Sequence, residues 1–130
     1  SPGAGMNVDK LITLVDQHAA RQTNYRHLSS RYRQAVNDEA RQMAEMTAEA
    51  DDLAEQIILL PLEKLVAVPP EEMEAAGVSL VQGRRLVAAR RLVARLRSES
   101  EALAEELKQS QALTSRLVEF AAQRGELLNQ

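Results

Sequence analysis

The sequence predicts an all-α fold: a long antiparallel helical hairpin of the coiled-coil type, with a short, proline-containing helical tip, that associates into a larger helical bundle. Three observations predict it. Apolar residues recur at heptad spacing through both halves of the chain. Prolines and the chain's most apolar run interrupt this pattern near the middle. Blocks of opposite charge alternate along the chain, so that folding it back on itself sets opposite charges side by side.

The first long helix is expected over residues 7–60, because no proline or glycine interrupts that stretch. Its expected inward face combines two heptad series. The first is Leu11, His18, Tyr25, Tyr32, Glu39, Met46, Leu53 and Leu60, and the second is Val15, Gln22, Ser29, Val36, Met43, Ala50 and Ile57. Leu14, Leu28 and Ala35 widen the stripe on one side.

The tip is expected over residues 61–79. Pro61 lacks an amide hydrogen and should end or kink the first helix, and the pair Pro69–Pro70 should break the chain again. A short helix is expected to begin at Pro70, with its acidic residues near its N-terminal end and Gly77 stopping it.

The second long helix is expected over residues 80–128. Ser79 and Gln82 fit a capping box at its start, although Gly83 weakens the first turn. Its inward series are Leu86, Val93, Ser100, Leu107, Thr114, Ala121 and Leu128, together with Ala89, Leu96, Leu103, Ser110, Leu117 and Arg124.

The charge blocks favour antiparallel helices. Residues 42–75 hold nine acids and one lysine, whereas residues 84–97 hold six arginines and no acid. A chain reversal near residue 70 sets these blocks beside each other. The register stays open between an alignment with Ser29 beside Ser110 and a slip of one heptad with Tyr25 beside Ala121.

Composition narrows the possible functions. The 130 residues suit a single domain over 6–130, and SPGAG at residues 1–5 is interpreted as a cloning remnant. The absence of cysteine excludes disulfides, zinc–thiolate sites and cysteine nucleophiles. No signal peptide or membrane span is visible, which favours a cytoplasmic protein. No nucleophile arrangement, P-loop or Glu-x-x-His pair occurs, so neither enzymatic activity nor a cofactor or metal is expected.

Polar residues on the inward stripe are expected to fix the register or the oligomeric state. These residues are His18, Gln22 and Glu39. Because the apolar stripe is wider than a two-stranded seam needs, we expect the hairpin to associate, as a homodimer or with another coiled-coil protein.

The resulting hypothesis is a non-enzymatic scaffold or assembly subunit that docks a protein through its apolar tip or along the hairpin margin. The candidate tip residues are Ile58, Leu59, Leu62, Leu65, Val66, Val68 and Val81. The expected charge-pairing or anion-contacting residues are Arg84, Arg85, Arg90, Arg91, Arg95 and Arg97.

Two alternatives remain. The arginine-rich segment 84–97 could bind nucleic acid, although no aromatic residues are interleaved for base stacking and the neighbouring acidic block would repel phosphate. The expected hairpin outline is also similar to small chaperone and stalk proteins of bacterial secretion systems and to phage scaffolding proteins. That similarity is one of shape alone, and it implies a protein client or an assembly role.

Overall fold

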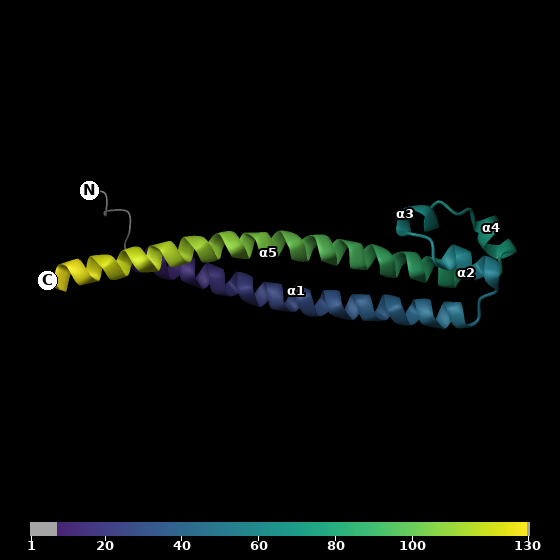
Figure 1. The fold of residues 1–130 in the computed structure, drawn as a ribbon, viewed down its shortest axis with the longest axis horizontal. Helices are drawn as coiled ribbons and strands as arrows, with labels where there is room; N and C mark the ends of the chain where they lie inside the picture. Colours follow the sequence, from purple (N-terminus) through teal and green to yellow (C-terminus); the bar gives the residue numbers. More distant parts are fainter. Residues whose placement is uncertain (1–7, 130) are drawn as a thin grey trace. The chain divides into compact units, whose positions relative to one another are not determined.

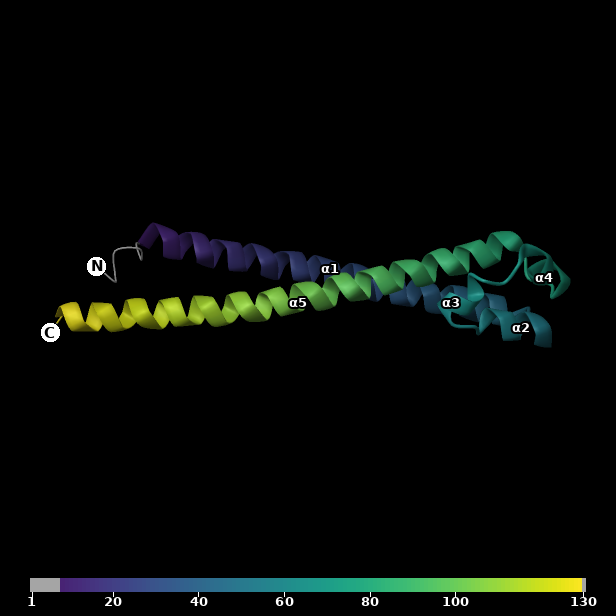
Figure 2. The same ribbon diagram turned by 90° about the horizontal axis from the view of Figure 1, so that it is seen from above.

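The computed structural model describes residues 8–129, with side chains described through residue 125. The SPGAG segment and the predicted helix start at residue 7 lie outside the described residues. The described chain consists of helices and connecting loops, with no strand. The long helices α1 (Val8–Ala48) and α5 (Leu80–Asn129) pack against each other in opposite directions, and three short helices connect them (Figures 1 and 2). The antiparallel hairpin inferred from the charge blocks is therefore confirmed.

The chain divides into two compact units. Unit 1 comprises Ser1–Ser29 with Glu99–Gln130, and unit 2 comprises Ser30–Ser98. Unit 1 holds the first part of α1 and the last part of α5. Unit 2 holds the remainder of both long helices and all three short ones, so every feature of the predicted tip belongs to unit 2.

In unit 1, α1 and α5 meet along stripes with alternating spacings of three and four residues. The buried or half-buried positions on α1 are Leu11, Leu14, His18, Arg21, Tyr25, Leu28 and Ser29. Those on α5 include Ser100, Leu103, Leu107, Ser110, Thr114 and Leu117. The prediction for α5 is thus confirmed along most of its length, whereas Ala121 and Arg124 are exposed.

The second series predicted for α1 is wrong in part, because Val15, Gln22 and Val36 are exposed. The series that begins at Leu14 is buried or half-buried as far as Gln42, while Ser29, Met43 and Ala50 of the predicted second series are half-buried as well. In the sequence, apolar residues flank the first series of α1 on both sides. Contact with α5 decides which of these flanking residues are buried.

The first long helix ends at Ala48, so the prediction of one helix over residues 7–60 is wrong beyond that residue. Helix α2 (Asp52–Ile58) follows as a separate element. Asp51 adopts an extended backbone, and its carboxylate accepts a hydrogen bond from the Ala54 amide at 2.8 Å. This N-cap satisfies one of the amides that a helix start leaves without a partner, and it replaces the hydrogen bonds that α1 would have gained by continuing.

The short helices α3 (Leu62–Leu65) and α4 (Pro70–Ala75) complete the connection. Helix α4 ends in a Schellman motif. The Val78 amide donates to the Met73 carbonyl at 2.9 Å, and the Gly77 amide donates to the Glu74 carbonyl at 3.0 Å. The motif needs a left-handed residue, and Gly77 supplies it with φ of 86°.

Unit 2 is built around a core to which every one of its helices contributes. Its buried members are Met46, Ala54, Ile58, Leu65, Met73, Val78 and Leu86. Leu65 and Leu86 have almost no exposed surface. The break after Ala48 allows Ala54 and Ile58 to be buried in this core, and burial of their apolar surface stabilises the fold. If α1 continued as one helix, these two residues would lie away from α5.

The register differs from both alignments considered for the sequence. In unit 1, His18 Nδ1 lies 2.6 Å from Ser110 Oγ. In unit 2, Arg97 Nε donates to the Tyr32 hydroxyl at 3.0 Å. Neither predicted alignment gives these pairs. The reason is that α1 stops at Ala48 while α5 starts at Leu80, so the reversal is centred earlier in the chain than residue 70.

Candidate protein-docking groove

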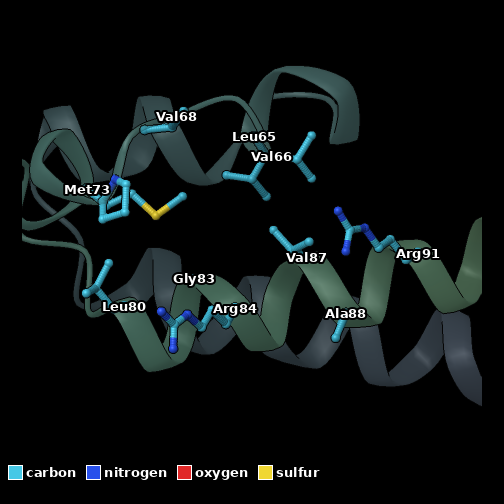
Figure 3. A pocket seen from close by; sticks show the side chains of 11 residues that line it. Leu65, Val66, Val68, Met73, Leu80, Gly83, Arg84, Val87, Ala88 and Arg91 are labelled. Atoms are coloured by element: carbon cyan, nitrogen blue, oxygen red, sulfur yellow. The ribbon is translucent and has the colours of Figure 1, made fainter.

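A groove of about 380 Å³ lies in unit 2 between the α3–α4 segment and the first turns of α5 (Figure 3). Most of its lining residues are of apolar types. The lining residues are Leu65, Val66, Val68, Pro70, Met73, Leu80, Gly83, Arg84, Val87, Ala88 and Arg91. This volume lies at the lower end of the range typical of small-molecule and cofactor pockets.

Prolines and a glycine explain how the chain forms this groove. Pro61 and Pro69 stand in extended conformation immediately before α3 and α4, so the chain here forms two separate short helices and no continuous one. Gly83 lies buried on α5 opposite Met73, and a β-carbon at Gly83 would stand 3.1 Å from the Met73 sulfur. Glycine at this position therefore lets α4 approach α5 closely, at a cost in helix propensity.

The predicted tip residues separate into three groups. Ile58 and Leu65 are buried in the core, so only their edges can contact a partner. Val66 is exposed and Val68 half-buried, and both line the groove together with Leu65. The others, Leu59, Leu62 and Val81, do not line it.

Met73 is a groove residue that the sequence analysis did not single out. Its only sequence signal is that it is the one large apolar side chain in the acidic helix α4.

The six arginines of the 84–97 segment do not act as one surface. Arg84 and Arg91 line the groove. Arg85 lies instead in a separate depression with Glu45 and Gln42.

The remaining arginines make intramolecular contacts. Arg97 donates to Tyr32, and Arg95 also has an interaction within the chain. The acidic block that begins at residue 42 was the expected partner of this segment, but the ion pair formed by Arg90 is with Glu39, which precedes that block, at 3.6 Å between Nε and Oε1.

Arg90 is the most deeply placed of these arginines, with 11% of its side chain exposed. Its guanidinium donates one hydrogen bond to the Leu60 carbonyl and another to the Ile58 carbonyl at 2.6 Å. A further contact of 3.0 Å joins it to the Met43 sulfur. The last carbonyls of a helix lack intrahelical partners, and a cation is favourable beside them. Arg90, which belongs to α5, therefore links the C-terminal end of α2 to α5 and also contacts α1.

The three polar residues predicted on the inward stripe differ in burial and in contacts. His18 is buried, and its Nε2 has no hydrogen-bond partner among the described residues. Glu39 is half-buried beside Arg90. Gln22 is exposed and so cannot be a core position, because α1 presents the neighbouring Arg21 and Tyr25 toward α5 instead.

Other kinds of site find no support in the described part of the chain. No group of three or more histidine, aspartate or glutamate residues is arranged to hold a metal ion within residues 8–129. Across the same residues, no helix has the combination of length and apolar character needed to span a bilayer.

No protein-family model matches the chain, and no curated protein or solved structure shows significant similarity to it.

Proposed function

We propose that this chain is a non-enzymatic interaction protein that docks a protein partner in the groove of unit 2. The observation that supports the proposal is an apolar concavity fixed on a packed core. Leu65 and Met73 line the groove and are also buried members of the unit 2 core, while Val66 remains 44% exposed beside them. An exposed apolar lining on a rigid base is typical of protein interaction sites.

A photocrosslinking experiment tests this proposal. A benzophenone amino acid replaces Val66 in the full chain, the crosslinked protein is identified by mass spectrometry, and that protein is then purified and titrated. We expect Val66→Asn to weaken binding at least about tenfold, because it removes an apolar contact inside the groove. Val81→Asn is the matched control, since Val81 is 58% exposed but lies outside the groove. Equal binding by both variants would refute groove docking.

We further propose that the hairpin self-associates through unit 1. Several large apolar side chains there are exposed although they belong to helices already paired: Val8, Ile12, Val15, Leu113, Val118 and Phe120. A second hairpin covering them would form an antiparallel four-helix bundle. Light scattering on a sizing column should then give twice the chain mass of 14.4 kDa. Ile12→Glu with Val15→Glu should restore the single-chain mass, and a wild-type monomer at all concentrations would refute self-association.

Nucleic-acid binding is the weaker alternative. Arg90 and Arg97 are occupied by contacts within the chain, so the segment presents fewer cations than its sequence implies. The groove also contains no aromatic side chain on which a base could stack.

A further inference from the structure

We infer that the groove selects an acidic amphipathic helix of a protein partner; this rests on the proposed docking function and names the chemistry of what docks. The charge of the groove is the first argument. Its lining contains two charged residues, Arg84 and Arg91, and no acidic residue. The complementary surface therefore carries carboxylates next to apolar side chains.

The second argument is that these two arginines lack partners of their own. Within residues 8–129, no hydrogen bond or ion pair joins Arg84 or Arg91 to another described residue, in contrast to Arg90 and Arg97. A partner that covered the groove without supplying carboxylates would strip water from two unpaired guanidinium groups, which is unfavourable. A partner with carboxylates would instead form charge-assisted hydrogen bonds. The arginines thus disfavour apolar segments that lack acidic residues.

The spacing along α5 defines the arrangement on the partner. Arg84 and Arg91 stand seven residues apart, about 10.5 Å along a helix, and Val87 lies between them (Figure 3). A helix lying along α5 would match this pattern with two acidic residues seven positions apart and apolar residues between them. Those apolar residues would contact Val66, Val68 and Val87.

The groove walls favour a helical occupant over an extended one. Strand addition requires a row of unpaired backbone groups on the receptor. The walls here are formed by α4, α5 and residues 65–68, and the amides of residues 64–68 already donate to nearby backbone carbonyls. Recognition must therefore occur through side chains, as when an amphipathic helix lies in an apolar groove.

The experiment starts from a displayed library of random peptides screened against the full chain. Enriched peptides are synthesised, and their affinities for the wild type and three variants are measured by fluorescence anisotropy. The first variant is Arg84→Glu with Arg91→Glu. The second is Val66→Asn. The third is a charge-matched control, Lys108→Glu with Arg116→Glu, in which both positions are exposed on α5 and neither lines the groove.

We expect the enriched peptides to combine acidic and apolar residues at helical spacing. Their affinity should fall about tenfold or more in the Arg84/Arg91 variant and stay unchanged in the Lys108/Arg116 control. Peptides with lysine in place of the acidic residues should regain affinity for the Arg84/Arg91 variant. Affinity for the wild type should also fall as salt concentration rises.

Three results would overturn the inference, and each has a different meaning for the docking function. Peptides without acidic residues that bind the Arg84/Arg91 variant normally but fail on Val66→Asn would leave groove docking intact and refute the partner class. Peptides that bind Val66→Asn and the Arg84/Arg91 variant as well as the wild type would refute both. Binding of a single-stranded oligonucleotide that depends on Arg84 and Arg91, without peptide enrichment, would assign the arginines to nucleic acid.

Discussion

Replacing Arg90 by methionine should destabilise the fold more than any exposed substitution on the same helix. Arg90 supplies hydrogen bonds to the carbonyls of Ile58 and Leu60, and methionine can fill most of the buried volume but cannot donate. A hydrogen bond from a charged donor contributes about 1.5–3 kcal/mol. Loss of two such bonds, with the two carbonyls left beside the core, should lower the free energy of unfolding by about 3–5 kcal/mol.

The Glu39 contact adds little to this figure. The Glu39 side chain is 26% exposed and lies 3.6 Å from Arg90, so water can hydrate its carboxylate once the arginine is gone. Arg90→Lys should fall between the wild type and Arg90→Met, because an ammonium keeps the charge but lacks the fork that reaches both carbonyls.

Urea denaturation followed by far-UV circular dichroism measures the effect, with Arg91→Met as the matched control. Arg91 is exposed, so its replacement should change the free energy of unfolding by less than about 0.5 kcal/mol. Amide hydrogen exchange adds a local measurement, since α2 should lose protection in Arg90→Met before the rest of unit 2 does. Equal stability of the two variants would refute the role of Arg90 in fastening α2.

Three further predictions concern the supporting structure, and each is measured by urea or thermal denaturation. Asp51→Ala should cost about 1 kcal/mol by removing the N-cap of α2, whereas Asp51→Asn should be nearly neutral; equal losses would contradict the capping role. Leu86→Ala should cost about 2–5 kcal/mol because the side chain is fully buried, and Leu59→Ala, at a 57% exposed position, should cost far less. His18→Leu should be neutral or stabilising by about 1 kcal/mol, because Nε2 is buried without a partner and Ser110 keeps its bond to a backbone carbonyl; a lowered melting temperature would contradict this.

The sequence predicted the long elements well where local rules decide them. The start of α5 at Leu80, the end of α4 before Gly77 and the inward residues of α5 through Leu117 lie where a capping-box sequence, glycine and heptad spacing predicted them. Those signals act within a few residues of the position they control. The break after Ala48 was not predicted, because no such local signal accompanies it. No proline or glycine marks it, and the Asp51 N-cap resembles an ordinary exposed aspartate until Ala54 and Ile58 are placed in the core.

The candidate site was predicted only in part. The apolar character of the 57–70 segment pointed to Val66 and Val68, which line the groove. It also pointed to Leu59, and the apolar residues after the tip pointed to Val81; both are exposed elsewhere in unit 2. An apolar run cannot indicate which of its residues face a cavity, because that depends on how short helices without strong periodicity pack on a distant helix.

By itself, the sequence determined that the chain is helical, that its two long helices run antiparallel, and that prolines divide the segment between them. These properties follow from backbone restrictions, heptad spacing and the sign of the charge blocks, all of which can be recognised in the linear sequence. Tertiary structure alone decided the register, the break after Ala48, and the division of one arginine-rich segment into half-buried Arg90 and groove-lining Arg84 and Arg91. The physical reason is that burial and hydrogen-bond pairing depend on partners far away in the chain, and identical residue types acquire different roles according to what packs against them.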